Sequence, residues 1–473
     1  MHSPPTQREI ALVVVLLFSL VFFFRSNRAP RLSHASESPV HPPALLSESS
    51  GIPTLPTSSR VSWGSDPVPR TQIVTHVPGW TIFDKMYVLN GTVYLVTSEP
   101  DSVPDRKYIT STGINIDNDP VKVAARIPTD KDMKIISPEE AKRLFGTGAN
   151  RVQGVTWLNN DPRQFITHYY HWSAELFFGF WRAYSSLDPF IPASGKTRLP
   201  PPRRVLFTHL DAGHWRDYAS MNQWVLRTAF PSVTMEFSQD WADRAAMGVP
   251  FVFDRVLFAD RAAAINGANW GKTQRTASEP FALPGSPNWW STFRNNVIDF
   301  AGLNATEGAG TRGKPVITYI SRQGWGRRML IQEDHEKLVE ELYKLRDTYG
   351  YEVNVVSMDK LSRIEQLRLS GRTTVMMGVH GNGLTSLLWM KPTPRSTVME
   401  FFYPGGFAHD YEYTTRALGM VHFGFWGNSA FTRPDVPPVA YPEGFQGNEI
   451  PIDGRVVAKL VHERIILSDE ADD

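Results

Sequence analysis

The sequence contains no cysteine among its 473 residues. This absence excludes a disulfide, a thiolate metal site and a thiol nucleophile. The sequence also lacks an excess of charge of either sign, because 49 Lys and Arg residues face 48 Asp and Glu residues, for a formal net charge of +1. Proteins that bind nucleic acids carry a basic excess or a basic stripe. The charge balance therefore predicts that the chain has no nucleic-acid partner.

Long hydrophobic runs are also scarce, and the one that stands out lies at the N-terminus. Residues 10–24 are apolar apart from one serine. The run is short for a membrane span, but it ends in three phenylalanines and is followed by Arg25, where a cleavage site would need small residues. We therefore expect a signal-anchor transmembrane helix over 10–24. Residues 1–9 would be a cytosolic tail, and 25–70, rich in Ser and Pro, a disordered stem.

This layout predicts a single-pass type II protein of the Golgi or endoplasmic reticulum membrane, with its globular part in the lumen. The positive-inside rule does not favour that orientation, since three arginines closely follow the run and only Arg8 precedes it. Two N-glycosylation sequons, at Asn90 and Asn304, favour the lumen.

The globular part divides near a glycine-containing linker at residues 307–314. Before it, residues 71–310 contain a predicted hairpin around Asn90 and then alternating strands and helices. After it, residues 311–450 alternate strand and helix regularly, which predicts a parallel, doubly wound sheet. Residues 451–473 are expected to form a C-terminal helix and tail. The fold class is therefore α/β.

The segment GVHGNGLTSLL follows a predicted strand and opens a predicted helix. Ligands of doubly wound sheets bind outside the carboxyl ends of the strands. Glycines such as Gly381 and Gly383 let a phosphate approach the helix N-terminus closely, His380 can add a hydrogen bond, and Thr385 can cap the helix or contact a phosphate. The alternative is a tight turn in which the glycines serve packing alone.

A second loop, ISRQGWGRR, follows another strand of the same sheet. It carries Arg322, Arg327 and Arg328, whose guanidinium groups suit the oxygens of a diphosphate. A solvated basic loop is the alternative. Two loops suited to anions at strand ends of one sheet together favour a nucleotide-diphosphate site.

Two further features concern catalysis. In HYYHWSAEL, His171 and Glu175 are four residues apart and share a helix face, so they can form a general base with its orienting partner, or an ordinary surface pair. Asp117 and Asp119 form an Asp-x-Asp pattern that can hold a metal ion under a diphosphate. Pro120 follows directly and favours an Asx turn instead.

Taken together, these motifs resemble those of glycosyltransferase family 61 over residues 165–425. The family's HGAGLTN motif resembles HGNGLTS at His380, with Asn and Ser in place of the common Ala and Asn. Its Glu-(Ile/Phe)-x-Pro strand resembles EFFYP at Glu400. Its Ser-Arg and following Arg-Arg resemble the Arg322 loop, and its His-Trp-x-x-Glu helix resembles the sequence from His171 to Glu175.

The family includes plant xylan xylosyl- and arabinofuranosyltransferases, animal enzymes that add N-acetylglucosamine to proteins, and fungal members, and the chain resembles the fungal type. The resemblance implies a GT-B fold, in which two Rossmann-like domains face each other across a cleft. Residues 71–310 would bind the acceptor and 311–450 the nucleotide sugar, and the last helix would cross back to the first domain.

The resemblance also implies an inverting transfer of a sugar, xylose or N-acetylglucosamine, from a UDP-sugar to a hydroxyl of a glycan or glycoprotein, with no cofactor or required metal. Glu175 or His171 is the expected base. Arg322 and Arg327 would stabilise the departing UDP, and Glu400 would accept hydrogen bonds from the ribose. Two alternatives stay open: a membrane-tethered pseudoenzyme or carbohydrate-binding protein without turnover, and a metal-dependent transferase using Asp117 and Asp119.

Overall fold

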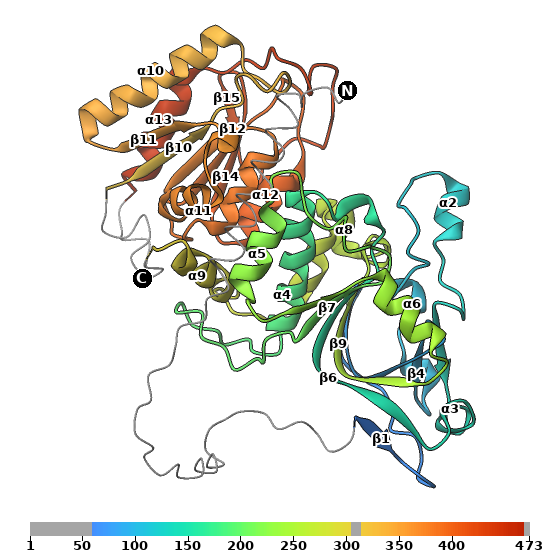
Figure 1. Ribbon diagram of the computed structural model, residues 1–473. Coiled ribbons are helices and arrows are strands. Elements are labelled where there is room, and N and C mark those ends of the chain that lie inside the picture. The colour runs from blue at the N-terminus through green and yellow to red at the C-terminus, as the bar shows by residue number, and fades with distance from the viewer. Residues whose placement is uncertain (1–58, 304–313, 468–473) are drawn as a thin grey trace, which may run out of the picture. The chain divides into compact units, whose positions relative to one another are not determined.

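The computed structural model describes residues 59–303 and 314–467 (Figure 1). The expected signal anchor at 10–24, most of the expected stem and the sequon at Asn304 lie outside these residues. Within the described ranges, no helix has both the length and the apolar character needed to cross a bilayer.

The first half of the chain builds a mixed sheet of nine strands, in the order β5-β4-β3-β9-β6-β7-β8, with β1 on β6 and β2 on β3. Neighbours β9, β6, β7 and β8 run parallel, whereas β2, β3 and β4 pair antiparallel. The strands are β1 (Arg60–Ser62), β2 (Gln72–Val77), β3 (Trp80–Leu89), β4 (Thr92–Val96), β5 (Met133–Ile136), β6 (Gly148–Asn159), β7 (Arg204–Phe207), β8 (Thr234–Glu236) and β9 (Phe251–Ala259).

The predicted hairpin is the β3–β4 pair. Its turn residues Asn90 and Gly91 have φ angles of 51° and 80°, and such positive angles at both centres of a two-residue turn match the twist of the strands. The folded unit begins earlier than the expected stem boundary at residue 70, so that boundary is wrong. Strand β1 pairs with β6, and Trp63 is buried because its ring packs edge-on against Tyr87.

Helices cover this sheet and extend toward the second half. They are α2 (Pro120–Ala125), α3 (Pro138–Phe145), the π-helix η5 (His171–Phe177), α4 (Phe178–Ser185), α5 (Met221–Ala229), α6 (Ser238–Ala246), α7 (Arg261–Ala264), α8 (Ala268–Thr273) and α9 (Ser291–Phe300). Short 3-10 turns lie at η2 (Pro100–Ser102), η3 (Arg106–Tyr108), η4 (Arg163–Phe165) and η6 (Thr276–Ala282). The predicted helix that carries His171 and Glu175 is therefore a π-helix, and an α-helix follows it directly.

The second half contains a six-stranded sheet in the order β11-β10-β12-β13-β14-β15. Its first five strands are parallel, as predicted, and β15 is antiparallel. The strands are β10 (Val316–Ile320), β11 (Glu352–Val356), β12 (Val375–Val379), β13 (Thr397–Phe401), β14 (Val421–Trp426) and β15 (Ser429–Phe431). If the five parallel strands are numbered along the chain, their order across the sheet is 2-1-3-4-5. The switch point of this sheet, where the strand order reverses, therefore lies between β10 and β12.

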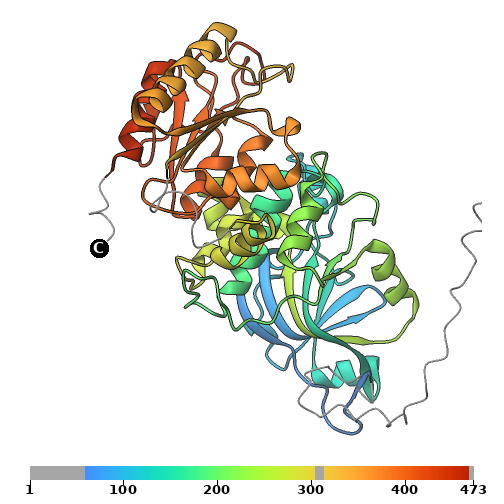
Figure 2. The same cartoon turned by 60° about the vertical axis from the view of Figure 1, so that its left-hand side comes forward.

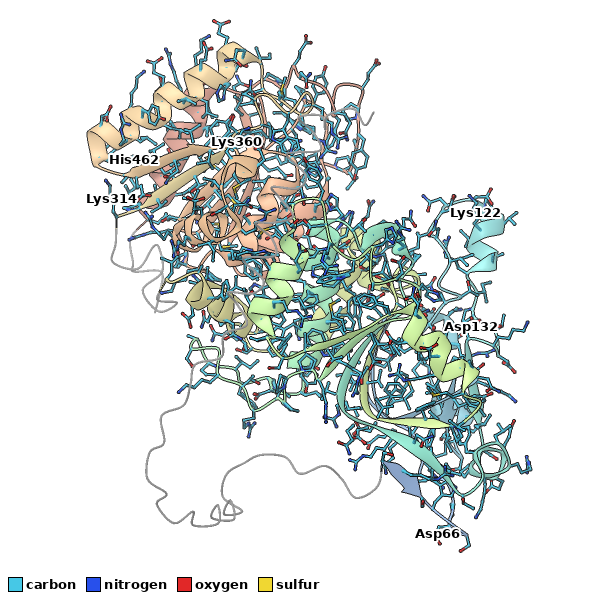
Figure 3. All side chains as sticks on the ribbon, viewed as in Figure 1. Asp66, Lys122, Asp132, Lys314, Lys360 and His462 are labelled. Carbon is cyan, nitrogen blue, oxygen red and sulfur yellow. The ribbon has the colours of Figure 1, made fainter. Side chains whose placement is uncertain are left out.

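Helices flank both faces of this sheet. They are α10 (Gln332–Tyr349), η7 (Met358–Lys360), α11 (Arg363–Arg372), the 3-10 helix η8 (Asn382–Trp389), α12 (His409–Ala417) and α13 (Gly454–Ile465). Helices α10 and α13 lie side by side on the outer face (Figure 2). A Cβ at Gly454 would lie 2.6 Å from the Leu338 Cα of α10. His462 of α13, which Figure 3 labels, hydrogen-bonds Tyr351 at 3.0 Å. The expectation that the last helix crosses back to the first domain is therefore wrong.

One of the hydrophobic core clusters spans both halves of the chain. A single cluster of buried residues includes Trp157 and Phe177 from the first half and Met376, Leu384 and Trp389 from the second. Helix α9 stands at the junction, where the Trp290 ring stacks on Phe293 and on Trp389. The described residues, 59–303 and 314–467, belong to one compact unit, so the expected division near residue 310 marks a change of sheet and not a break in packing.

Candidate functional site

Two loops meet at the switch point of the second sheet. Arg322 follows β10, and Gly381 follows β12. A Cβ placed on Gly381 would lie 2.6 Å from the Arg322 Nη1 atom. The φ of Gly381 is 162°, which is an extended conformation open to any residue. Glycine is therefore needed here because the Arg322 guanidinium occupies the space of a side chain, and not for backbone freedom.

Arg322 carries positive charge that the protein leaves without full compensation. Burial lowers the pKa of its guanidinium, and Arg328 lowers it further. The Nε atom of Arg322 is buried and makes no hydrogen bond to any described residue. Buried polar groups without a partner are rare in proteins and call for an explanation. An anionic ligand at this turn supplies one.

The other two arginines of the loop, Arg327 and Arg328, differ in exposure and in contacts. Arg328 is half-buried: its Nη1 donates to the His380 carbonyl oxygen at 3.4 Å, and its Nε donates to Gln446 at 2.7 Å. Arg327 is exposed to solvent. Of these two arginines, it is therefore Arg328 that contacts the His380 turn.

His380 belongs to a buried chain of three side chains. Its Nδ1 lies 2.5 Å from Glu400 Oε1, and Glu400 Oε2 lies 2.9 Å from His422 Nε2. Glu400 has no exposed surface. The expectation that Glu400 holds ribose hydroxyls does not fit this geometry, because both carboxylate oxygens are already engaged with imidazoles. Glu400 instead fixes the ring of His380 and leaves its Nε2 to face other groups.

Two more expected contacts lie around the same turn. Gly383 packs against β10, where an added Cβ would lie 2.9 Å from Ile320 Cγ2. Thr385 is fully buried and its hydroxyl lies 3.3 Å from Asn382 Oδ1. Its hydroxyl therefore serves the turn itself, so a direct phosphate contact by Thr385 does not fit.

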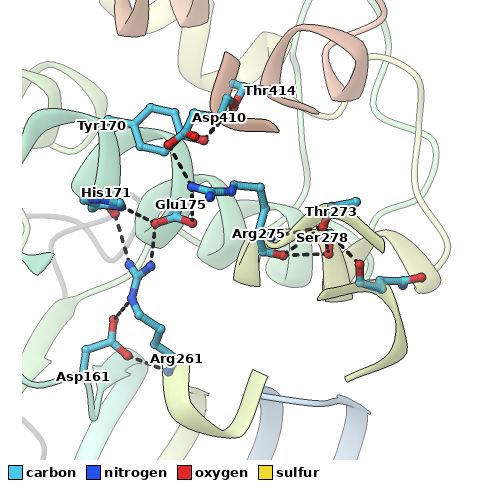
Figure 4. A network of polar contacts seen from close by, with 11 residues as sticks. Asp161, Tyr170, His171, Glu175, Arg261, Thr273, Arg275, Ser278, Asp410 and Thr414 are labelled. Atoms are coloured by element: carbon cyan, nitrogen blue, oxygen red, sulfur yellow. Dashed lines mark hydrogen bonds and ion pairs between the residues drawn. The ribbon is translucent and has the colours of Figure 1, made fainter. Parts of the chain in front are cut away.

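His171 and Glu175 lie in the π-helix η5, a helix form that is rare and frequent at functional sites. His171 Nδ1 lies 2.5 Å from Glu175 Oε2 (Figure 4). The same carboxylate also contacts Arg261 Nη1 at 2.5 Å and Arg275 Nη1 at 3.6 Å. Arg261 is itself held by Asp161, whose Oδ1 accepts from its backbone N–H at 2.7 Å.

These contacts decide the protonation state of Glu175. Burial by itself would raise the pKa of this carboxyl, but Arg261, His171 and Arg275 together hold it well below its ordinary value. A carboxylate bound to two guanidinium groups is a poor proton acceptor. The side chain of His171 keeps about a quarter of its surface exposed, at 26%. His171 is therefore the member of the pair that can exchange a proton with a ligand.

Asp410, at the start of α12, connects the two sets of residues. Arg275 Nη1 lies 2.8 Å from Asp410 Oδ1, and the Tyr170 hydroxyl donates to the Asp410 carbonyl oxygen at 2.8 Å (Figure 4). Burial would raise the pKa of Asp410, but Arg275, then His380 and His171, hold it below its usual value. The structure thus brings the predicted pair His171 and Glu175 into the same neighbourhood as the predicted turn at His380.

Sequence reasoning did not find the residues that make this connection. Arg261 and Asp161 follow the adjacent parallel strands β9 and β6. Their positions just after predicted strands in the first half could have identified them as candidates. Arg275 and Asp410 are separated by 135 positions and carry no local motif.

Asp117 and Asp119 serve a helix start. Asp119 caps α2 by accepting from Val121 and Lys122, and Asp117 pairs with the Lys122 ammonium at 2.6 Å. This is the geometry of an Asx turn. Within the described ranges, no three His, Asp or Glu side chains are placed to hold a metal ion together.

The fold and the site define an α/β protein with a cationic turn at a sheet switch point and an imidazole–carboxylate pair beside it. The family model described as Glycosyltransferase 61 matches residues 164–399, and the chain belongs to this family. The match contains η5, the Arg322 loop and the His380 turn, and it ends one residue before Glu400. Membership of this family implies that the substrates of the protein are a sugar donor and a glycan acceptor. A search of curated proteins found no match.

Proposed function

We propose that the protein is an inverting glycosyltransferase that moves a sugar from a UDP-sugar to a hydroxyl of a glycan or glycoprotein. The observation that carries this proposal is the juxtaposition at the switch point of Arg322, with its unpartnered buried Nε, and Gly381, which leaves that guanidinium room. The two loops provide a cationic seat for a diphosphate. Xylose and N-acetylglucosamine are the donor sugars that we favour.

His171 is the general base in this proposal. With its Nδ1–H donating to Glu175, its Nε2 is the acceptor form that can take a proton. The acceptor oxygen attacks the anomeric carbon of the donor while its proton passes to His171 Nε2. The bond between that carbon and the phosphate oxygen breaks, and the electron pair leaves with UDP. Attack from the face opposite the departing group inverts the configuration.

Arg322 and Arg328 stabilise the departing diphosphate, together with the backbone N–H groups that follow Gly381. Such donors are most effective when they are fixed before the reaction. Arg328 is fixed by Gln446 and the His380 carbonyl. Positive charge already in place at the leaving group removes the need for a metal ion in this proposal.

The fold type and the cellular location of the enzyme are also part of this proposal. We infer that the two halves act as the two sides of a GT-B-type enzyme, the first half carrying the base and the second the nucleotide. The apolar run at 10–24 and the sequon at Asn90, which is exposed at the tip of its hairpin, support a membrane-anchored enzyme of the Golgi or endoplasmic reticulum with its globular part in the lumen.

A thermal-shift panel on the full-length chain tests the proposal. A ligand that binds only the folded state raises the midpoint in proportion to the logarithm of its concentration over its dissociation constant. We expect UDP and a UDP-sugar to raise the midpoint with and without EDTA, and GDP and CMP to raise it less. We also expect release of UDP from the same UDP-sugar when an acceptor glycan is added.

Three results would contradict the proposal. The absence of a shift with any nucleotide would make the Gly381 turn a packing device. A shift with UDP-sugars but no turnover with any acceptor would support a pseudoenzyme or a carbohydrate-binding protein. A shift that disappears with EDTA would instead support metal-dependent binding.

A further inference from the structure

Trp325 is an exposed aromatic residue beside the proposed diphosphate seat. Its side chain is 42% exposed. It lies between Gly324 and Gly326, whose φ angles of 104° and 76° are in the region that favours glycine, and a Cβ at either position would meet no atom within 4 Å. The two glycines shape a tight loop that presents a large ring to solvent. The ring is therefore free to contact a ligand that binds beside Arg322.

The ring of Trp325 is held in place by neighbours on three sides. The Arg322 guanidinium lies 5.5 Å from the ring centroid. Asp359, in η7 after the neighbouring strand β11, accepts a hydrogen bond from the Ser357 hydroxyl. The Trp325 side chain is close enough to help lower the pKa of Asp359, after the larger effect of Ser357. Tyr218 of the first half approaches edge-on, with ring centroids 6.5 Å apart, and is itself 87% exposed. The indole is therefore oriented and still accessible.

Contacts run in sequence from Trp325 to the proposed base. Trp325 contacts Arg322, and Arg322 lies against Gly381. The ring of the adjacent His380 contacts Tyr411 at 5.5 Å. Tyr411 contacts Tyr170 at 5.2 Å, and Tyr170 contacts His171 at 5.4 Å. Trp325 and His171 thus stand at opposite ends of this series, with the cationic turn between them.

We propose that Trp325 is the stacking platform for the nucleobase of the donor nucleotide. This inference rests on the proposed function, because it takes the diphosphate to lie at Arg322 and Gly381. The reacting sugar must lie on the side of His171, so the nucleoside must extend from the diphosphate in the other direction, toward Trp325. Aromatic rings bind bases through their faces, and the Arg322 guanidinium strengthens the seat by its contact with both the ring and the phosphate.

Binding measurements with three probes test this inference. We would measure dissociation constants for UDP, UMP and inorganic pyrophosphate with the full-length chain and with the Trp325→Ala variant. A lost base–aromatic stack costs about tenfold or more in affinity. We expect weaker binding of UDP and UMP and unchanged binding of pyrophosphate, which has no base. Phe190→Ala removes another exposed aromatic ring, 82% exposed, and should change none of the three constants.

The outcomes separate the inference from the proposed function. If the unmodified chain binds UDP and Trp325→Ala binds it equally well, the platform is not for the base. If in that case the variant raises KM for the acceptor glycan alone, the ring belongs to the acceptor and the inference is overturned. If the unmodified chain binds neither UDP nor pyrophosphate, the diphosphate seat itself is wrong, and the proposed function fails with it. Weaker binding of all three probes would show that Trp325 acts through Arg322 and not on the base.

Discussion

At the scale of single residues, two buried carboxyl groups of this protein have opposite protonation behaviour. Glu175 is held ionised by two arginines. Asp260, which caps α7 and accepts from Ser111 and Asn160, has no arginine or lysine among the groups that set its pKa, and burial raises that pKa to about 6. Both groups are buried, so the neighbouring cations of Glu175, and not burial, account for the difference between the two pKa values.

The first residue-scale prediction concerns the base. His171→Asn should lower kcat by about 100- to 10,000-fold, the usual contribution of a general base, while the dissociation constant for UDP stays the same. Glu175→Gln keeps the shape of the side chain but leaves Arg261 and Arg275 without a full counter-charge. We expect this variant to lower both kcat and the unfolding midpoint, because unpaired buried charges are costly. Steady-state kinetics and thermal unfolding of both variants make the comparison.

A result in which Glu175→Gln abolishes turnover and His171→Asn retains it would reverse the two roles. In that case the carboxylate would be the base and the imidazole its partner.

The second residue-scale prediction concerns pH. Because the pKa of Asp260 is higher in the folded protein, about 6, than its ordinary 3.8, folding favours its neutral form. The stabilisation is complete below pH 4 and is lost as the pH rises through 6. The difference corresponds to about 3 kcal/mol. Asp260→Asn should remove this part of the pH dependence, as measured by urea unfolding between pH 4 and 8.

Asp66→Asn, at an exposed carboxylate, is the matched control and should leave the pH profile unchanged. If the profiles of the unmodified chain and Asp260→Asn run parallel from pH 4 to 8, Asp260 does not titrate in this window.

At the scale of elements, a substitution in the turn between β12 and η8 should change ligand binding without changing the stability of the fold. The three atoms nearest to a Cβ added at Gly381 all belong to the end of the flexible Arg322 side chain, the first at 2.6 Å. Gly381→Ala should therefore displace the guanidinium, weaken UDP binding by about tenfold through loss of a charged hydrogen bond, and leave the unfolding midpoint nearly unchanged. Calorimetric titration and thermal unfolding measure the two effects.

Gly378→Ala is the contrasting variant, three residues earlier and inside β12. Its Cβ would lie 2.9 Å from the Ile320 backbone oxygen of β10, which cannot move without disturbing the sheet. We expect this variant to lose stability. Equal loss of midpoint in both variants would mean that Gly381, too, is required for folding.

Some elements and contacts of this fold could be predicted from the sequence, and others could not. Strand–helix alternation predicted the parallel strands of the second sheet, because strands buried on both faces, such as β12, are apolar throughout. The loops at Arg322 and His380 were predicted because residues after parallel strands meet at one edge. The bridging pairs Arg275–Asp410 and Glu400–His422 were not predicted, since they join positions that only tertiary packing brings together. The π-helix at His171 was also missed, because its apolar periodicity reads as an ordinary helix.

At the scale of the whole molecule, the shared core predicts that the two halves unfold together. Trp290 stacks on Phe293 and Trp389, and its indole N–H donates to the Leu388 carbonyl at 2.9 Å. Trp290→Ala should cost about 3–5 kcal/mol, as large-to-small changes in cores do. Calorimetry should show one transition that moves to lower temperature. Two transitions, of which only one moves, would mean that the halves are separate cooperative units.

All fourteen tryptophans of the chain lie in the described ranges, and Trp325, 42% exposed, is the most exposed of them. Its indole should emit at longer wavelength than the buried ones and be the most accessible to a small collisional quencher such as iodide. The protein thus carries a natural optical reporter beside Arg322. Protection of that emission from iodide by an added nucleotide would follow occupancy of the site in real time, without any label.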